Sequence, residues 1–276
     1  MPPNWRACPA TKVPEVTRKA DTACLLLHGF GSTTFELEPL AEVLRQDGYA
    51  VHLEHLPGHT GDIQAFRKTF FRDWLQAAED RYRMLAARHA RVVPVGFSMG
   101  ASLSLFLAAK FDPVAAVCLA PGYPRRLWPL RRQTFLMMLL PVLQHLKPQL
   151  VLPPPNPESR AIAPYEGIEG YLCLPQVHSL VKGLKKLPEL LPAIHCPLLL
   201  MYDVRDRTCL AEDGIAIARR VSSKSVTYRL THMQENITSH HMLPTHSETK
   251  QIVIDDVKNF LDGCKAQLPS LFHKKR

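Results

Sequence analysis

The sequence lacks the features that mark an exported or membrane-spanning protein. Its seven cysteines are odd in number and form no C-x-x-C pair, which is typical of reduced thiols in a cytosolic protein rather than of a disulfide framework. The first 21 residues contain no apolar signal-peptide core. The apolar run FLMMLLPVL, interrupted by Pro141, is too short to cross a bilayer. We therefore expect a cytoplasmic protein.

The sequence also lacks the patterns of nucleic-acid recognition, although its formal net charge is +9. Lysines and arginines are scattered among acidic residues, with no basic recognition helix and no RNA-binding motif in which aromatic and basic residues are interleaved. We expect no nucleic-acid partner. The positive charge still allows a weak association with anionic membrane surfaces.

What the sequence does contain is a repeated alternation of short apolar runs with helical patterns. The apolar runs, which predict strands, cover residues 23–29, 50–59, 91–96, 114–120, 196–203 and 225–230. The helical patterns cover residues 36–49, 66–89, 98–111, 212–221 and 248–261. Strands that are apolar throughout and alternate with helices predict an α/β fold, with a mostly parallel central sheet covered by helices on both faces.

The alternation stops between residues 121 and 192, which are rich in proline and contain an apolar helix candidate at residues 133–145. We predict a short insertion over the carboxyl edge of the sheet, where ligands of open α/β sheets bind. It would form a cap, for which a packing helix with a long loop is the alternative. The cap's acyl pocket would be lined by Leu136, Met137, Leu140 and Leu143. The predicted units are an N-terminal extension (1–20), the core (21–120 and 193–265), the cap (121–192) and a basic C-terminal tail (266–276).

A serine stands between two glycines where a predicted strand meets a predicted helix, in the stretch Gly96-Phe97-Ser98-Met99-Gly100. This G-x-S-x-G pattern is typical of a nucleophile elbow, because only small residues fit around so tight a turn. The hydroxyl would stand clear of the sheet, above the positive end of the following helix. We therefore predict that Ser98 is a nucleophile.

A second glycine-containing loop, His28-Gly29-Phe30-Gly31, follows the first predicted strand. Attack by a serine on an acyl group generates an oxyanion, which needs two prepositioned N–H donors. We predict the backbone of Met99 as one donor and that of Phe30 as the other. The side chain of His28 is expected to make a structural hydrogen bond rather than to take part in chemistry.

A serine hydroxyl needs a general base, which in turn needs an orienting carboxylate. Asp203 and Asp206 both follow a late predicted strand. Asp206 is preferred, because it lies three residues beyond the strand end on a loop that can turn back toward the base. Asp203 is the alternative, and we expect it to cap the loop.

The candidates for the base lie between the last predicted strand and the last helix: His232, His240, His241 and His246. His232 is too close to the strand and His246 lies where the helix begins, so we favour His241, with His240 as the alternative. A histidine-rich metal site would be another interpretation of this loop. It lacks a carboxylate or cysteine at a recognisable ligand spacing, so we expect no metal and no cofactor.

The stretches LLLHGFGSTT, VGFSMG, CPLLLMYDVRDRTC and ITSHHML resemble, in matching order, the carboxylesterase and monoacylglycerol lipase branch of the α/β-hydrolase superfamily. The resemblance covers most of the chain and is weakest at residues 121–192. It implies an α/β-hydrolase fold with Ser98 as nucleophile, Asp206 as acid and His241 as base. It also implies the oxyanion donors Phe30 and Met99.

The chain departs from that branch at two glycines, which are replaced here by His240 before the base and by Asp203 before the acid. The stretch LPGHTGD is similar to the branch's P-G-H-G loop, and we expect His59 there to be structural.

The resemblance implies a serine hydrolase that cleaves small-molecule carboxylic esters, either short-to-medium acyl esters or monoacylglycerols. A thioesterase or an acyltransferase would use the same residues, because all three activities proceed through an acyl-enzyme. A non-catalytic binding protein would be expected to lack at least one of the three residues.

Overall fold

The computed structural model of the chain describes residues 21–124 and 132–271, and for residues 132–138 and 265–271 it describes the backbone alone. The central sheet has six strands in the spatial order β2-β1-β3-β4-β7-β8, and each neighbouring pair is parallel. These strands are β1 (Thr22–Leu27), β2 (Ala50–Leu53), β3 (Arg91–Phe97), β4 (Ala116–Leu119), β7 (Leu198–Asp203) and β8 (Val226–Thr231). The predicted α/β fold with a parallel sheet is confirmed.

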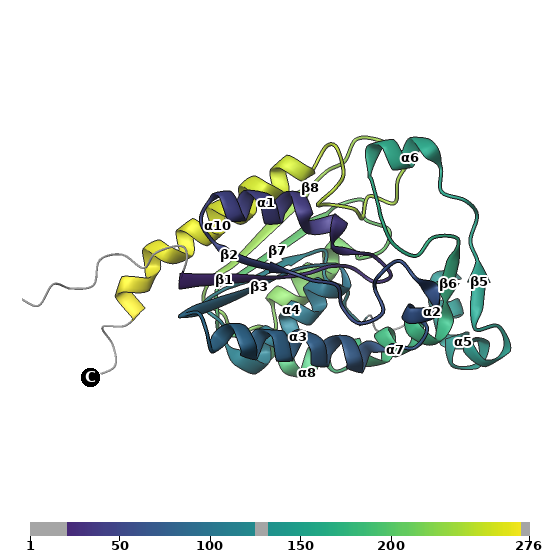
Figure 1. Cartoon of the computed structure of the whole chain (residues 1–276), viewed down its shortest axis with the longest axis horizontal. Helices are drawn as coiled ribbons and strands as arrows, with labels where there is room; N and C mark the ends of the chain where they lie inside the picture. Colours follow the sequence, from purple (N-terminus) through teal and green to yellow (C-terminus); the bar gives the residue numbers. More distant parts are fainter. Residues whose placement is uncertain (1–20, 125–131, 272–276) are drawn as a thin grey trace, which may run out of the picture.

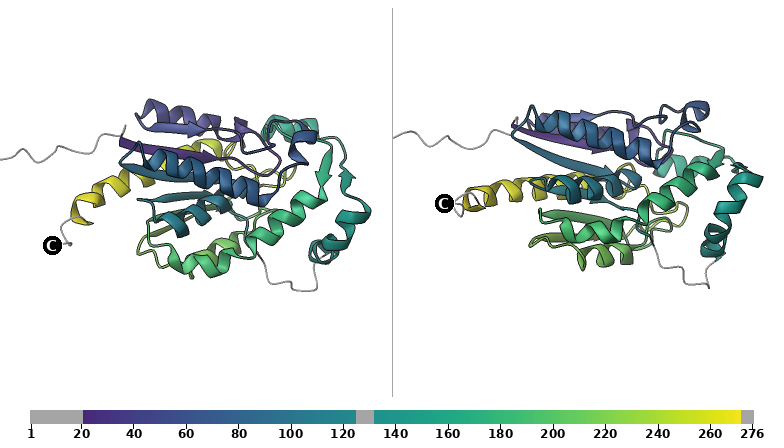
Figure 2. Two further views of the ribbon diagram at one scale, coloured as in Figure 1. Left: turned by 60° about the horizontal axis from the view of Figure 1, so that its bottom comes forward. Right: turned by 90° about the horizontal axis from the view of Figure 1, so that it is seen from below.

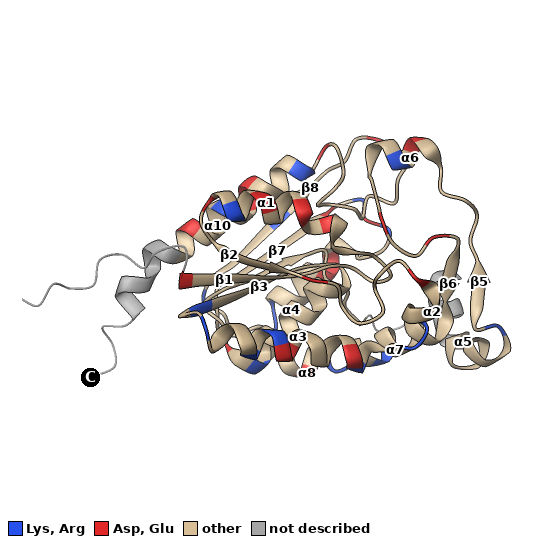
Figure 3. Ribbon diagram, viewed as in Figure 1, with Lys and Arg blue, Asp and Glu red and all other residues tan. Residues whose placement is uncertain are grey.

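Helices cover both faces of the sheet (Figure 1). On one face lie α1 (Glu38–Gln46) and α10 (Lys250–Leu271), and on the other lie α3 (Phe71–Ala86), α4 (Met99–Phe111) and α8 (Leu187–Leu190). The remaining core helices are η2 (Thr34–Leu37), α2 (Ile63–Phe66), η3 (Leu191–Ala193) and α9 (Ala211–Ala218). Both basic (blue) and acidic (red) positions occur along α1, α3 and α10 (Figure 3). Of the helices described, none combines the length and the apolar composition that crossing a bilayer requires.

In the core, two predicted elements differ clearly from the observed ones. The strand expected at residues 50–59 ends at Leu53, because the chain turns at Pro57 and at Gly58, whose φ is +76°. The helix expected at residues 66–89 is observed only as α3, residues 71–86, because a break separates it from α2, which ends at Phe66. The break precedes Phe70, whose N–H donates to the Asp73 carboxylate at 2.9 Å and so caps the start of α3.

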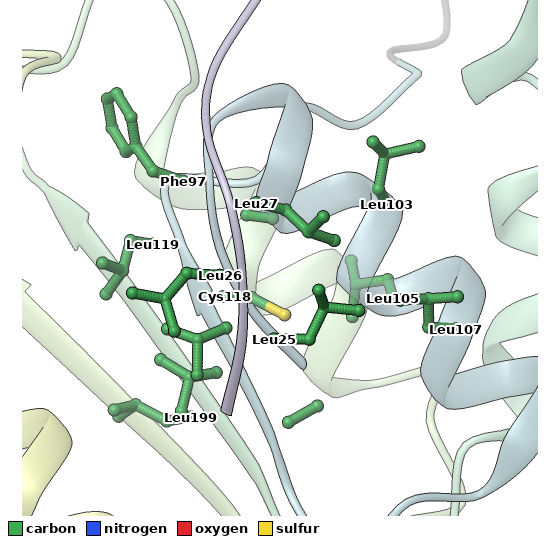
Figure 4. Packing of buried hydrophobic residues seen from close by; sticks show 14 of the residues in the cluster. Leu25, Leu26, Leu27, Phe97, Leu103, Leu105, Leu107, Cys118, Leu119 and Leu199 are labelled. Carbon is green, nitrogen blue, oxygen red and sulfur yellow. The ribbon is translucent and has the colours of Figure 1, made fainter. Parts of the chain in front are cut away.

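The core is built around α4, whose residues from Met99 to Ala108 are all buried. The buried side chains of α4 pack against β1, β3 and β4, with leucines such as Leu25, Leu103 and Leu105 in the cluster (Figure 4). Each fully buried leucine contributes about 1.5–3 kcal/mol relative to an exposed one. The turn between β3 and α4 therefore leads directly into a helix that is buried from Met99 to Ala108.

The insertion lies beyond the carboxyl ends of the strands (Figures 1 and 2). It consists of α5 (Arg132–Leu146), α6 (Pro157–Ile162), α7 (Leu174–Leu184) and a separate antiparallel pair of strands, β5 (Gln149–Val151) and β6 (Tyr171–Cys173). Of the predicted pocket residues, Leu140 is buried and Leu143 is half-buried, whereas the side chains of Leu136 and Met137 lie outside the described residues. Its role as a substrate cap stays a prediction.

The ends of the chain fall mostly outside the described residues. The predicted N-terminal extension, residues 1–20, and residues 272–276 of the predicted tail are not among them. Residues 266–271, also assigned to that tail, form the last turns of α10.

Candidate active site

The serine of the G-x-S-x-G turn lies between β3 and α4 in a strained backbone conformation. Ser98 has a φ of +53° and a ψ of −116°. A Cβ atom on Gly96 would lie 2.1 Å from the carbonyl oxygen of Gly100, and one on Gly100 would lie 1.9 Å from that of Leu27. Both distances exclude any side chain, so the two glycines are required by crowding, as predicted.

The three preferred residues meet at this turn although they come from loops after β3, β7 and β8. His241 Nε2 is 2.9 Å from Ser98 Oγ, and His241 Nδ1 is 2.7 Å from Asp206 Oδ2. The other oxygen of Asp206 accepts the N–H groups of Thr208 at 2.7 Å and Cys209 at 2.9 Å. Because the Asp206 side chain is fully buried and saturated with donors, it holds the imidazole in one orientation.

Asp203 acts as the loop-capping acid that the sequence suggested. Its Oδ1 accepts the N–H of Arg205 at 2.9 Å, and its Oδ2 accepts the Thr231 hydroxyl at 2.9 Å and the Met233 N–H at 2.8 Å. The guanidinium of Arg205 then donates to main-chain oxygens of the loop after β8, those of Met233, Gln234 and Glu235. These bonds tie the loop that carries Asp206 to the loop that carries the histidines.

The other histidines of that loop bond elsewhere. His240 is buried with a φ of +59°, and its Nε2–H donates to the Glu235 carbonyl at 2.7 Å. His246 Nε2 is 3.3 Å from the Glu235 carboxylate, and His232 is exposed. Burial opposes ionisation of Glu235, but hydrogen bonds from the Thr238 side chain and backbone outweigh it and lower the pKa of this carboxyl to about 2. An ionised carboxylate therefore organises the turn at His240.

The histidines near the H-G-F-G loop are structural, as expected. His28 Nε2 accepts the Leu56 N–H at 3.0 Å, while its Nδ1–H donates to the Gly29 carbonyl at 2.9 Å. Burial, together with the nearby His59, lowers the pKa of His28 to about 3. Burial also lowers the pKa of His59 to about 4. Both rings are thus neutral and serve to join this loop to the loop after β2.

The H-G-F-G loop runs beside the serine. The ring of Phe30 packs edge-on against Phe66 and Trp74, at 5.2 and 5.6 Å between centroids, which turns the side chain away into the core. Within residues 21–124 and 132–271, no protein acceptor bonds to the Phe30 N–H. The N–H of Met99, in the first turn of α4, has no intrahelical acceptor by geometry. Within the described residues, neither of these two N–H groups donates a hydrogen bond to the protein.

Two residues that support the site were not singled out in the sequence. Arg205 lies between the two candidate acids, but nothing in its immediate neighbours indicates the carbonyl groups that it binds. Glu36 Oε2 accepts the N–H of Gly29 at 2.8 Å, seven residues away in the chain. The only signal for Glu36 in the sequence was its position as an acidic residue at the start of the helix expected at residues 36–49.

Comparison with known proteins agrees with the resemblance seen in the sequence. The family model described as "Alpha/beta hydrolase family" matches residues 24–248. A thermostable monoacylglycerol lipase of Bacillus sp. (strain H-257) is 36% identical over 93 residues, which are 34% of this chain and 37% of that protein. A carboxylesterase of Bacillus subtilis (strain 168) is 31% identical over 98 residues, 35% of this chain and 40% of that protein. The matched segments thus span less than half of either relative.

The likeness to solved structures extends over most of the fold. One comes from the description of LipS and LipT, two metagenome-derived lipolytic enzymes, and has a TM-score of 0.74 and 19% identity. The superposition covers 88% of this chain and 94% of that one. At this level of identity the likeness shows a common fold, which is that of an α/β hydrolase.

Proposed function

Because the chain belongs to the alpha/beta hydrolase family, we propose that it is a serine hydrolase that cleaves carboxylic esters through an acyl-enzyme on Ser98. The observation that carries this proposal is the position of His241, within hydrogen-bond distance of both the Ser98 hydroxyl and the Asp206 carboxylate. A nucleophile, a base and an orienting acid in this relation are what acyl transfer requires.

In the first half of the reaction, Ser98 Oγ attacks the ester carbonyl carbon while its proton moves to His241 Nε2. The carbonyl π electrons move to the oxygen, and the resulting oxyanion accepts hydrogen bonds from the N–H groups of Phe30 and Met99. Collapse of this intermediate breaks the bond to the leaving alcohol, which takes the proton from His241. Asp206 stabilises the imidazolium that forms in between, through the 2.7 Å contact with Nδ1.

In the second half, a water molecule gives a proton to His241 Nε2 and attacks the acyl carbon. The oxyanion re-forms against the same two amides, and its collapse releases the carboxylic acid and returns the proton to Ser98. The two N–H donors to the oxyanion and the histidine base act in both halves of the reaction, so one arrangement of residues serves both steps.

The proposed substrates are short-to-medium acyl esters or monoacylglycerols. Two curated relatives are named for a monoacylglycerol lipase and a carboxylesterase activity, which supports this class. The insertion supplies apolar side chains beyond the carboxyl ends of the strands, including the buried Leu140 and the half-buried Leu143. An acyl chain that leaves Ser98 in that direction would contact apolar side chains rather than water.

The test is removal of each of the three groups in turn. Ser98→Ala is expected to abolish p-nitrophenyl ester turnover and labelling by a fluorophosphonate probe, and His241→Ala to lower kcat by about 10⁶-fold. Asp206→Asn should cost about 10⁴-fold in kcat, because the imidazole loses its tautomer and its counter-charge. Ser222→Ala and His232→Ala, at exposed positions, are the matched controls and should retain wild-type rates. Labelling that persists in Ser98→Ala would refute the proposal.

A further inference from the structure

Glu36 is a buried carboxyl that the proposed reaction does not use. It lies in η2, where only 2% of its surface is exposed. Burying an ionisable group is unfavourable unless strong hydrogen bonds compensate for the lost water. Burial raises the pKa of this carboxyl to about 7, although the hydrogen bond from the Gly29 N–H acts in the opposite direction. Because burial of this carboxyl is unfavourable, we expect Glu36 to have a function that an apolar residue could not perform.

The carboxyl lies against the residue that separates it from the serine. Glu36 Oε2 accepts the Gly29 N–H at 2.8 Å. A Cβ atom on Gly29 would lie 3.0 Å from that same oxygen and 3.5 Å from the Cβ of Ser98. Gly29 is thus enclosed between Glu36 and Ser98, and a shift of the carboxyl would move the peptide that leads into Phe30.

The following residues of the loop are held by residues 165–168 of the insertion, which we call the strap. The carbonyl of Gly31 accepts the Tyr165 hydroxyl at 2.8 Å and the Ile168 N–H at 2.7 Å. The carbonyl of Glu166 accepts the Thr33 N–H and the Ser32 hydroxyl, both at 3.1 Å.

The loop is therefore bonded on both sides of Phe30, by Glu36 before it and by the strap after it. Among the described residues, the Phe30 N–H has no protein acceptor.

We propose that Glu36 is a positioning residue that, through Gly29, aims the Phe30 N–H at the oxyanion. The inference rests on the proposed function, because it assigns Phe30 a role in acyl transfer. Donors to an oxyanion act only when they lie within a few tenths of an ångström of the position where charge develops, and loss of one such donor lowers kcat by about 10²–10³-fold. Displacement of the loop should therefore affect the transition state far more than the bound substrate.

The decisive comparison is between two replacements of similar size. Glu36→Met removes the acceptor, and we expect kcat to fall by about 10–100-fold with KM within about threefold. The affinity for a trifluoromethyl ketone, whose adduct with the serine carries an oxyanion, should fall by the same factor as kcat/KM. Glu36→Gln keeps an oxygen acceptor for the Gly29 N–H and should stay within about threefold of wild type. Glu38→Met, at an exposed acid two residues away, is the control and should change nothing.

Several results would overturn the inference while the proposed function survives. These are an unchanged kcat in Glu36→Met, a loss in Glu36→Gln as large as in Glu36→Met, or a fall in kcat without a parallel fall in trifluoromethyl ketone affinity. If Glu36→Met does not fold, Glu36→Asp draws the carboxyl back by one methylene and is subject to the same criteria. Wild-type enzyme that neither labels at Ser98 nor binds the ketone would instead overturn the proposed function and this inference together.

Discussion

Two turns beside the candidate site hold a residue other than glycine in a left-handed conformation, and they are supported in opposite ways. Ser98, with a φ of +53°, is flanked by Gly96 and Gly100, whose missing side chains leave room for the turn. His240, with a φ of +59°, has no such neighbours and is held by polar contacts with Glu235 and Thr238. A strained turn can thus be stabilised either by flanking glycines or by additional hydrogen bonds. The two turns should therefore respond differently to mutation.

The largest effect on activity and stability is expected at Gly100, where no side chain can be accommodated. Gly100→Ala places a Cβ 1.9 Å from the Leu27 carbonyl, between a central strand and the core helix, where neither backbone can move. We expect the variant to lose ester turnover and to unfold well below the wild-type melting temperature, since overpacking of a core costs about 1–3 kcal/mol or more. Gly263→Ala in α10, where a Cβ would meet nothing within 4 Å, is the control and should be neutral or stabilising.

The second prediction concerns acid, to which the loops beside the Ser98 turn and the turn at His240 should respond in different pH windows. His28 and His59 have lowered pKa values of about 3 and about 4, so unfolding takes up protons below pH 6.5 and stability falls as the pH drops. Each histidine contributes about 1.4 kcal/mol per pH unit. Glu36, with a raised pKa of about 7, acts in the opposite direction between pH 4.5 and 7 and offsets one of them. The turn at His240 depends on Glu235, whose support is lost only as the pH falls below 4.5 toward about 2.

Urea denaturation at pH 7.5, 6.0 and 5.0 measures this slope. His59→Gln should reduce the slope of the unfolding free energy against pH by about 1.4 kcal/mol per pH unit, which is the contribution of one proton. His195→Gln, at an exposed position, should leave the slope unchanged. A free energy of unfolding that is constant from pH 7.5 to 5.0 would contradict the prediction, in which Glu36 offsets only one of the two buried histidines.

The third prediction tests the bonds that support the histidine loop from outside. Arg205→Met removes the donors to the carbonyls of Met233, Gln234 and Glu235 but keeps the length of the side chain. The loop would then be free to shift His241 relative to Ser98, and we expect about a tenfold fall in kcat, the size of a misalignment worth about 1.4 kcal/mol. Arg219→Met, on an exposed part of the surface, serves as the control for the loss of a charge. Equal kcat values in the two variants would show that the carbonyl contacts are dispensable.

The smallest effect concerns stability at residue 240, where the backbone has a positive φ without a glycine. At residue 240, glycine should be more stable than alanine by about 1–2 kcal/mol, because only alanine retains the left-handed penalty. At Gln76, an exposed position of α3, the order should reverse, with glycine about 1 kcal/mol less stable than alanine. Thermal unfolding of the four variants gives both differences. The same order at both positions would remove the case for strain at His240.

The comparison also explains what the sequence could and could not predict. The requirement for small residues around Ser98 appears as glycines within a five-residue window, so the turn and the flanking strand and helix were recognised at once. The polar support of His240 comes from residues two to five positions away and from Arg205, on another loop. Such partners leave no local pattern, and neither did the 2.8 Å bond from Gly29 to Glu36. The short strands β5 and β6 were missed for the same reason, because they pair with each other across 19 residues and not with the central sheet.

The strap bears on how far the insertion can be exchanged between related enzymes. Recombination of caps treats them as modules joined to the core at two seams, here near residues 121 and 192. Tyr165 and Ile168 create a third seam in the middle, where the insertion bonds to Gly31. A chimaera that replaces residues 121–192 without a tyrosine and a free amide at this point would inherit a new pocket over a loosened loop. Grafts that retain residues 165–168 should keep their turnover while their preference among acyl chains changes.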